Sequence, residues 1–152
     1  MLDTRALTPA DVDLVCYHRT AMFRDMGRGE QQIAAMIGPF RRWLKARLGD
    51  GAYFGFVVED GGVPVAGLGL LINEWPPALT HPGSDRRGYI LDVYVEPSHR
   101  RRGIARALVL EALAEFRRRD ITYVALHASD SGRPLYASLG FTATAEMGVC
   151  LV

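Results

Sequence analysis

Cysteine is scarce in this sequence, and so are the patterns that mark metal sites. The only two cysteines, Cys16 and Cys150, lie far apart and match no C-x-x-C spacing for zinc or redox chemistry, so both are expected to be reduced, packed thiols. His18, His81 and His99 fit no metal-ligand spacing either. No metal is therefore predicted as a cofactor.

Long apolar runs are missing as well. Residues 1–5 lack the basic start followed by an apolar stretch that a signal peptide needs. No uninterrupted apolar run approaches the ~18 residues of a membrane span. The chain is therefore expected to be cytoplasmic and to have no membrane partner.

The sequence also lacks an excess of one charge. It carries 18 basic and 17 acidic residues, which leaves a net charge of +1 at pH 7. Many nucleic-acid-binding proteins are strongly basic, so no nucleic-acid partner is predicted, although a local basic patch stays open. With 152 residues, 49% of them hydrophobic, the chain is expected to fold as one globular domain.

Several common enzyme motifs are absent. The sole lysine, Lys45, is followed by Ala46, whereas a phosphate-binding loop needs Lys followed by Ser or Thr. Gly67-Leu68-Gly69 has Ile72 where the third glycine of a dinucleotide-binding turn belongs. There is no H-E-x-x-H helix and no G-x-S-x-G elbow, so zinc-protease and serine-hydrolase chemistry are not expected.

What is present begins with two helical segments. Thr8-Pro9-Ala10-Asp11 has the form of a capping box with proline at the first helical position, and it predicts a helix from Pro9 to about Asp25. A second helical stretch covers 30–48, and Gly38-Pro39 is expected to break or kink it. Both helices are expected to cover a sheet.

Strand patterns follow. Segments 52–59 and 63–73, joined by Asp60-Gly61-Gly62, predict a hairpin. The segment from Tyr89 to Val95 is apolar on both faces except at Asp92, which is typical of a central strand covered by helices.

The remainder alternates helix and strand. A helix is predicted over 103–119, a strand over 121–127, a short helix over 131–139 and a final strand over 146–152. The order β-α-α-β-β-β-α-β-α-β predicts an α/β fold with a mixed, mostly antiparallel sheet and helices on both faces. The strand at 121–127 is expected to lie parallel to the one at Tyr89 to Val95.

The turn between that strand and the helix at 103–119 predicts an anion site. A helix N-terminus offers unpaired amides and partial positive charge, and Gly103 allows close approach of a phosphate. Segment 100–119 holds seven arginines against Glu111 and Glu115, a local charge of +5. An anionic partner is expected here.

Three motifs carry a resemblance to a known family. Arg100-Arg101-Arg102-Gly103-Ile104-Ala105 matches the pattern R/Q-x-x-G-x-G/A. The strand end Val93 to Pro97 is similar to the family's V-x-P, and Leu135 to Phe141 is similar to its L-Y-x-x-L-G-F. The sequence therefore resembles the GNAT superfamily of acetyl-CoA-dependent N-acetyltransferases, most strongly from Gly88 to Phe141.

The resemblance implies that residues 1–152 form a single N-acetyltransferase domain with acetyl-CoA as cosubstrate. Its reaction would move an acetyl group to a primary amine of a small molecule or peptide by direct attack in a ternary complex. Strand backbone would bind the pantetheine arm and the thioester carbonyl, and turn amides would bind the pyrophosphate. The cofactor-binding residues are then expected to be Val93, Tyr94, Val95, Arg100, Arg101, Arg102, Gly103, Ile104, Ala105 and Arg106.

The resemblance also implies a catalytic acid. Tyr136 would lie at the sulfur, where a phenol with pKa near ~10 stays protonated at neutral pH and can protonate a thiolate leaving group with pKa near ~8.5. Ser129 is a departure, since many family members have an asparagine there that contacts pantetheine.

The general base stays open. Asp92 is the leading candidate because it is an acid in an apolar strand beside the expected acetyl site, although it could instead be a hydrogen-bonded core acid. Glu74, His127 and a chain of water molecules are the rivals. A loop such as 28–38 or 75–87 is expected to shape the acceptor pocket.

Two other functions remain as alternatives. One is a catalytically silent acyl-CoA-binding sensor or regulatory module with the same fold. The other is an RNA-binding protein that uses the arginines of 100–119. The identity of the amine acceptor is not predicted, and a homodimer stays open.

Overall fold

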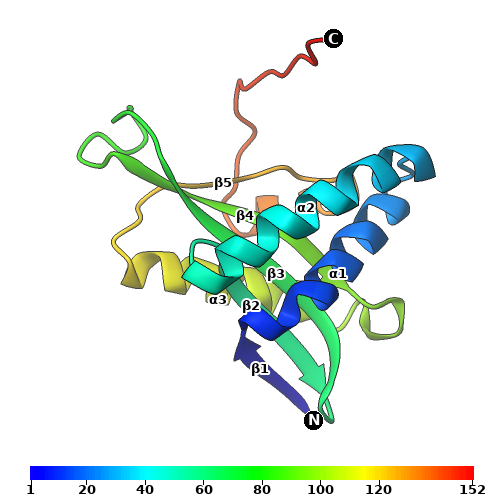
Figure 1. Ribbon diagram of the computed structural model, residues 1–152. Helices are drawn as coiled ribbons and strands as arrows, with labels where there is room; N and C mark the ends of the chain where they lie inside the picture. The colour runs from blue at the N-terminus through cyan, green and yellow to red at the C-terminus, as the bar shows by residue number, and fades with distance from the viewer.

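The computed structural model describes residues 1–152 and contains one five-stranded sheet, in which the strands lie side by side in chain order (Figure 1). The first four strands pair antiparallel and the fifth is parallel to the fourth. The strands are β1 (Leu2–Ala6), β2 (Phe54–Asp60), β3 (Val63–Glu74), β4 (Arg86–Val95) and β5 (Val124–Leu126). The predicted mixed, mostly antiparallel sheet is confirmed.

Helices lie on both faces of the sheet (Figure 1). One face packs against α1 (Val12–Asp25) and α2 (Glu30–Asp50), and the other against α3 (Ile104–Arg118) and the short α4 (Arg133–Ser138). Two short 3-10 helices, η1 (Pro9–Asp11) and η2 (Pro97–His99), precede α1 and α3. None of the helices combines the length and the apolar character needed to cross a membrane.

The entry to α1 is built as predicted. The Oγ1 atom of Thr8 accepts a hydrogen bond from the amide of Ala10 at 3.3 Å, and a carboxylate oxygen of Asp11 accepts one from the amide of Thr8 at 2.8 Å. The Arg5 guanidinium donates to both oxygens of Asp11, at 2.8 and 2.9 Å, and lowers the pKa of that carboxyl. The cap therefore also ties α1 to β1.

The β2–β3 hairpin is also confirmed. Gly61 and Gly62 have φ of 58° and 84°, the left-handed values that a two-residue type I′ turn requires at both central positions. Residues other than glycine, asparagine or aspartate rarely adopt this conformation.

The predicted interruption at Gly38-Pro39 is wrong in one respect, because α2 runs through Pro39 without a break. A proline inside a helix costs about 3 kcal/mol. The helix offsets this cost by burying one face, formed by Ile33, Phe40, Leu44 and Leu48, against the sheet and α1.

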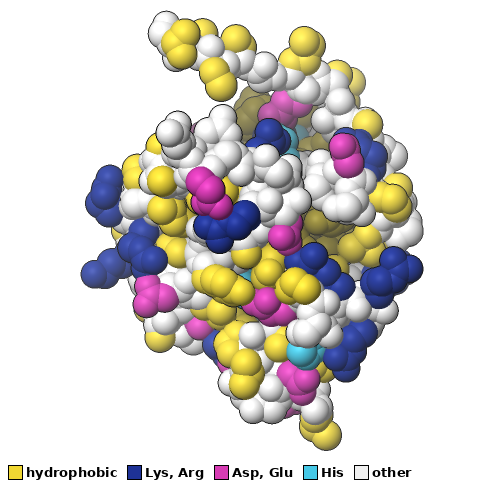
Figure 2. Space-filling model, turned by 90° about the vertical axis from the view of Figure 1, so that its right-hand side faces the viewer, with side chains coloured by type: hydrophobic (Ala, Val, Ile, Leu, Met, Phe, Trp, Pro, Cys, Tyr) yellow, Lys and Arg dark blue, Asp and Glu magenta, His cyan; other side chains and the backbone are white.

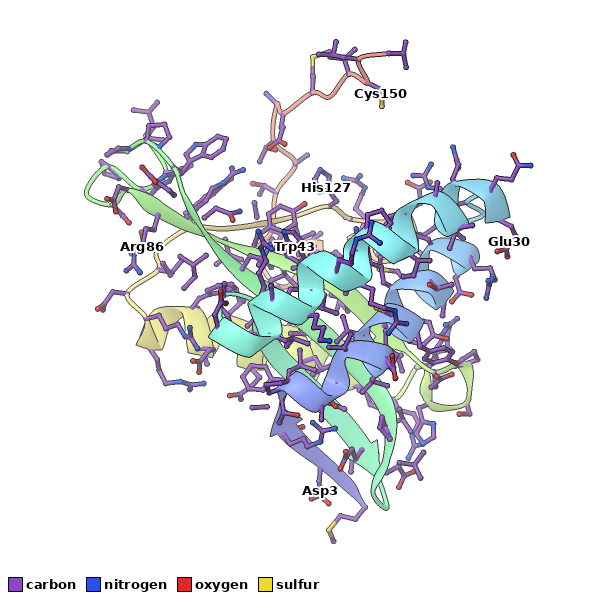
Figure 3. All side chains as sticks on the ribbon, in the orientation of Figure 1. Asp3, Glu30, Trp43, Arg86, His127 and Cys150 are labelled. Atoms are coloured by element: carbon purple, nitrogen blue, oxygen red, sulfur yellow. The ribbon has the colours of Figure 1, made fainter.

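The expected final strand is absent. Residues 142–152 are all exposed and extend away from the body of the molecule, with apolar side chains in solvent (Figures 1 and 2). Cys150 lies on this segment and is exposed, so only Cys16 is the packed thiol that was expected (Figure 3). A strand needs a hydrogen-bonded neighbour, and the chain supplies none here.

A buried histidine gives the fold a measurable pH dependence. His18 of α1 is 3% exposed, lies 5.2 Å from the Tyr94 ring and has no hydrogen bond to its Nε2 atom. Burial lowers the pKa of His18 to about 4 from a usual value near 6.5.

We expect the wild type to lose about 3 kcal/mol more unfolding free energy than His18→Leu between pH 7 and pH 4. The unfolded chain takes up a proton on His18 below about pH 6.5, whereas the folded chain does so only near pH 4. Proton uptake by His18 in the unfolded chain therefore lowers the free energy of unfolding as the pH falls from about 6.5 to about 4. Urea unfolding at pH 7, 5.5 and 4 measures it, and equal pH dependence of the two proteins would contradict the expectation.

Candidate functional site

The neighbouring strands β4 and β5 separate partway along the sheet. Their pairing ends at Ile90 opposite Leu126, but β4 continues to Val95 with β3 as its only partner (Figure 1). Residues 91–95 therefore present one edge of strand backbone that no other strand covers. Such an edge can accept an extended ligand through main-chain hydrogen bonds.

A bulge in β4 coincides with this separation. Leu91 pairs with Gly69 while Tyr94 pairs with Gly67, so β4 has one residue more than β3 in this stretch. Asp92 lies in the bulge with a φ of 58°, a left-handed conformation that aspartate tolerates better than most residues.

The Asp92 side chain is held from two directions. Its Oδ1 atom accepts a hydrogen bond from Nη1 of Arg19 at 2.7 Å, and its Oδ2 atom accepts one from the Tyr53 hydroxyl at 2.7 Å. Gly69 makes room for Tyr53, because a Cβ at that glycine would lie 1.9 Å from the phenol oxygen. Asp92 is 5% exposed, and burial raises its pKa against the opposing effect of Arg19.

This arrangement gives each oxygen of Asp92 a protein donor, as expected for the alternative of a hydrogen-bonded core acid. A role as general base stays a prediction. The other two candidates, Glu74 at the end of β3 and His127 after β5, are both exposed. Arg19 and Tyr53 were not found from the sequence, where the isolated acid in an apolar strand was the only signal.

The turn before α3 offers a row of free amides. Arg101 and Gly103 have φ of 61° and 80°, and the first main-chain bond of the helix runs from the Ala107 amide to the Gly103 carbonyl at 3.0 Å. The six amides of 101–106 donate to no acceptor in the protein. A Cβ added at Gly103 would meet nothing within 4 Å, so the turn is open to a ligand.

The arginines of the turn divide into two groups. The Arg100 guanidinium is already hydrogen-bonded within the protein: it donates to the Val95 carbonyl at 2.8 Å and to the Asp25 carboxylate at 2.6 Å. Arg101 and Arg102 are exposed and have no hydrogen bond or ion pair to another protein group. The free positive charge therefore lies beside the free amides.

The other residues predicted to bind the cofactor differ in how far their side chains are exposed. Tyr94 and Ile104 bury their side chains in the core, so only their backbone is available to a ligand. Ala105, Val93 and Val95 are half-buried. Arg106 is exposed and donates to the Ser138 hydroxyl of α4 at 3.1 Å.

Tyr136 lies on α4, in the same core as α3. Its ring packs edge-to-face against Phe141 at 5.9 Å, and burial raises its pKa. The Tyr136 hydroxyl makes no hydrogen bond within the protein, so it is free to donate to a ligand. Ser129 turns the chain toward α4 by accepting hydrogen bonds from the Gly132 amide on its Oγ and carbonyl oxygens, at 3.1 and 3.2 Å.

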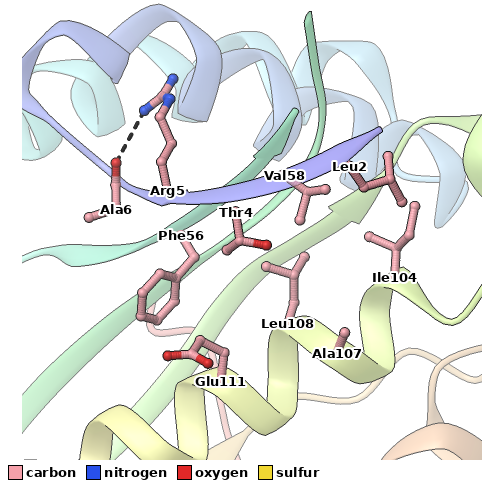
Figure 4. A pocket seen from close by; sticks show the side chains of 10 residues that line it. All are labelled: Leu2, Thr4, Arg5, Ala6, Phe56, Val58, Ile104, Ala107, Leu108 and Glu111. Atoms are coloured by element: carbon pink, nitrogen blue, oxygen red, sulfur yellow. Dashed lines mark hydrogen bonds between the residues drawn. The ribbon is translucent and has the colours of Figure 1, made fainter. Parts of the chain in front are cut away.

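An apolar groove also lies on the α3 side of the sheet. This groove of about 450 Å³ runs between β1, β2 and α3, and includes no residue of β4, β5 or α4 (Figure 4). It shares only Ile104 with the turn at 101–106 and does not reach the uncovered β4 edge. No group of three or more His, Cys, Asp or Glu side chains is placed to hold a metal ion.

Comparison with known proteins agrees with this geometry. Residues 19–141 match the acetyltransferase (GNAT) family. The chain belongs to this family. The resemblance predicted from the turn and strand motifs is thereby confirmed, together with the GNAT fold, whereas the roles of individual residues stay predictions.

Solved structures show how far the likeness extends. A GCN5-related N-acetyltransferase from Ralstonia eutropha JMP134 is 52% identical over 99% of both chains, with a TM-score of 0.98. A predicted acetyltransferase from Clostridium acetobutylicum, crystallised with acetyl-CoA, is 26% identical over 99% of this chain and 96% of that one, with a TM-score of 0.90. Among curated proteins, no sequence matches.

More distant structures show the fold alone. An aminoglycoside acetyltransferase from an uncultured soil metagenomic sample is 22% identical over 100% of this chain and 99% of that one, with a TM-score of 0.74. The fold of this GNAT protein is therefore shared with enzymes that differ from it widely in sequence.

Removing the Asp92 carboxylate is expected to destabilise the fold. Asp92→Ala should lower the free energy of unfolding by about 3 kcal/mol, because it leaves the Arg19 charge and the Tyr53 hydroxyl without their partner. Asp13→Ala is the matched control, since Asp13 pairs with Arg41 at the surface and its loss should cost less than ~1 kcal/mol. Urea unfolding at pH 7 measures both, and equal losses would contradict the role of the Asp92 pair.

Proposed function

We propose that this GNAT protein transfers an acetyl group from acetyl-CoA to a primary amine of a small molecule or peptide, by direct attack in a ternary complex. The observation that carries the proposal is the row of six free amides at 101–106, next to the uncovered β4 edge at 91–95. Residues 1–152 would act as a single acetyltransferase domain.

The turn suits a pyrophosphate. Amides at a helix N-terminus bind phosphate oxygens through hydrogen bonds and the partial positive charge of the helix end. Arg101 and Arg102 add two unpaired positive charges, and Arg100 braces the turn by joining the Val95 carbonyl to Asp25 of α1. Acetyl-CoA would supply the acetyl thioester, and the backbone of Val93 to Val95 would bind its pantetheine arm and polarise its carbonyl.

Tyr136 would protonate the departing thiolate. Its hydroxyl has no competing protein partner, and its raised pKa keeps the proton on the phenol at neutral pH. The acceptor amine would lose its proton to Asp92, Glu74, His127 or a chain of water molecules. Asp92, held by Arg19 and Tyr53, would also fix the bulge.

Direct attack is favoured over a covalent intermediate on the enzyme. Cys16 is buried between α1 and α2, and Cys150 lies on the exposed segment beyond α4. Cys16 packs in the core that includes Leu91 of β4 but is only 2% exposed, so neither thiol is exposed at the turn or at the β4 edge to take up the acetyl group.

Blocking the turn should remove cofactor binding. Gly103→Asp is expected to raise the dissociation constant for acetyl-CoA at least tenfold (~1.4 kcal/mol), because it places a bulky carboxylate in the phosphate position. Gly51→Asp is the matched control: Gly51 has a φ of 81°, faces open space and lies at the end of α2. Isothermal titration measures both variants, and equal affinities would contradict the assignment.

Removing the phenol hydroxyl should slow the reaction without weakening binding. Tyr136→Phe is expected to lower kcat by about 10²-fold while leaving acetyl-CoA affinity unchanged, because the ring keeps its packing against Phe141. Tyr123→Phe is the control, since Tyr123 comes just before the first residue of β5 and does not lie on α4. The assay follows CoA release across a panel of amines from pH 6 to 10.

An unchanged rate over that range would contradict the acid role of Tyr136. Tight acetyl-CoA binding by the wild type without turnover of any amine would instead favour the silent acyl-CoA-binding module.

A further inference from the structure

Arg87 of β4 is a largely buried cation without a hydrogen-bonded partner. Its side chain is 12% exposed, and its Nε atom is buried and makes no hydrogen bond. The guanidinium carbon lies 3.7 Å from the centroid of the Trp75 ring. Its one ion pair, with the Glu146 carboxylate, is 4.0 Å long, which exceeds hydrogen-bond distance. Because arginine is rarely buried unless it is paired, Arg87 has the capacity to hold a further anion.

A second donor without a partner lies on the same face of β4. The hydroxyl of Tyr89 is buried and makes no hydrogen bond. Alternate residues of a strand share a face, so Arg87, Tyr89 and Leu91 lie on one side of the sheet. Leu91 packs in the core formed with α1 and α2, which identifies that side. Two neighbouring donors that lack acceptors indicate a ligand that supplies oxygen atoms.

The same face leads to the point where β4 and β5 separate. Leu91 is the first residue of β4 beyond the pairing with β5. His127, labelled in Figure 3, follows β5 directly, and its ring lies 5.5 Å from the Tyr89 ring. At about 3.3 Å per residue, the backbone of Arg87 lies about 13 Å from that of Leu91. A ligand that reaches from the Arg87 guanidinium to this opening must therefore be extended.

Glu146 indicates which anion Arg87 takes. Its carboxylate is 60% exposed and lies on residues 142–152, which make no main-chain hydrogen bond with the rest of the protein. An exposed ion pair of this kind contributes little free energy, so another carboxylate can replace Glu146. The carboxylate of a small ligand can approach the guanidinium to about 2.8 Å and accept two hydrogen bonds from it.

We propose that the amine acceptor is a small amino carboxylic acid, whose carboxylate binds Arg87 and whose amine, several bonds away, reaches the uncovered β4 edge beside Leu91. This inference rests on the proposed acetyl transfer and makes Arg87 the residue that selects the acceptor. The carboxylate displaces Glu146 and stays unreacted. At the other end, the nitrogen bonds to the acetyl carbon as the bond from that carbon to sulfur breaks; one proton leaves the amine and one joins the thiolate.

The first test compares acceptors that differ only in the carboxylate. The acids ε-aminocaproate and γ-aminobutyrate are each paired with their uncharged amides in the assay of CoA release. At least one acid should have a KM about tenfold lower than that of its amide, because only the acid forms charge-assisted hydrogen bonds with Arg87. Arg87→Gln should erase this difference. Arg86→Gln is the matched control and should keep it, since Arg86 is exposed on the opposite face of β4.

A second variant covers the case in which Arg87→Gln does not fold. Glu146→Gln changes only an exposed side chain and removes the carboxylate that competes for Arg87. It should lower the KM of the preferred acid about threefold, with no such effect on the amide. An acid KM that is unchanged or raised in this variant would contradict the displacement of Glu146.

A titration tests the same contact without turnover. The N-acetylated products of the two acids, and the corresponding amides, are added to the protein saturated with CoA. The Trp75 indole signal, assigned with Trp75→Phe, is followed by ¹H–¹⁵N NMR, because the Trp75 ring stacks on the Arg87 guanidinium. At least one acid should shift this signal at about tenfold lower concentration than its amide, and Arg87→Gln should remove that preference.

The outcomes separate this inference from the proposed function. Acetylation of the amines with no preference for the acids would overturn the inference and leave acetyl transfer in place. Failure to acetylate any amine would contradict the proposed function, and the titration alone would then decide whether Arg87 binds a carboxylate. Equal shifts with acid and amide, or a preference that remains in Arg87→Gln, would overturn the role of Arg87.

Discussion

The ion pair between Arg19 and Asp92 joins α1 to β4 at the point where the sheet opens, and the shape of the candidate site depends on it. Asp92 occupies the extra position of the bulge, and its carboxylate is fixed by Arg19 and the Tyr53 hydroxyl. A buried ion pair adds little net stability compared with apolar packing, but breaking it is costly. The pair therefore sets the geometry of the uncovered β4 edge more than it adds to overall stability.

The charge at the site is more local than the sequence indicates. Of the seven arginines in 100–119, three are neutralised: Arg100 pairs with Asp25, and Arg118 and Arg119 pair with Glu115. Arg101 and Arg102 keep their charge beside the six free amides. Arg106 and Arg117 have no ion pair either, so three of the four unpaired arginines belong to the turn at 101–106 and one lies at the far end of α3. Most of the unpaired charge is therefore gathered at the turn, in a compact group that suits a pyrophosphate.

Local patterns predicted most of the fold, because turns and caps depend on residues close in sequence. The Thr8–Asp11 cap, the Gly61-Gly62 turn and the α3 N-terminus were all found this way. The partners of Asp92 could not be predicted, since Arg19 and Tyr53 lie 73 and 39 residues away and are brought close only by the packed fold. The continuous α2 and the unpaired 142–152 were missed for the same reason, because in each case tertiary contacts or their absence decided the outcome.

The central claim is that the free amides of 101–106 and the uncovered β4 edge form one binding site. The most direct test is an amide ¹H–¹⁵N NMR titration of the wild type with desulfo-CoA, which has the pyrophosphate and pantetheine but no reactive thiol. The account predicts that amides in 101–106 and in 91–95 shift together with one affinity. Binding that leaves both sets unchanged, or that moves amides only in the groove between β1 and α3, would contradict it.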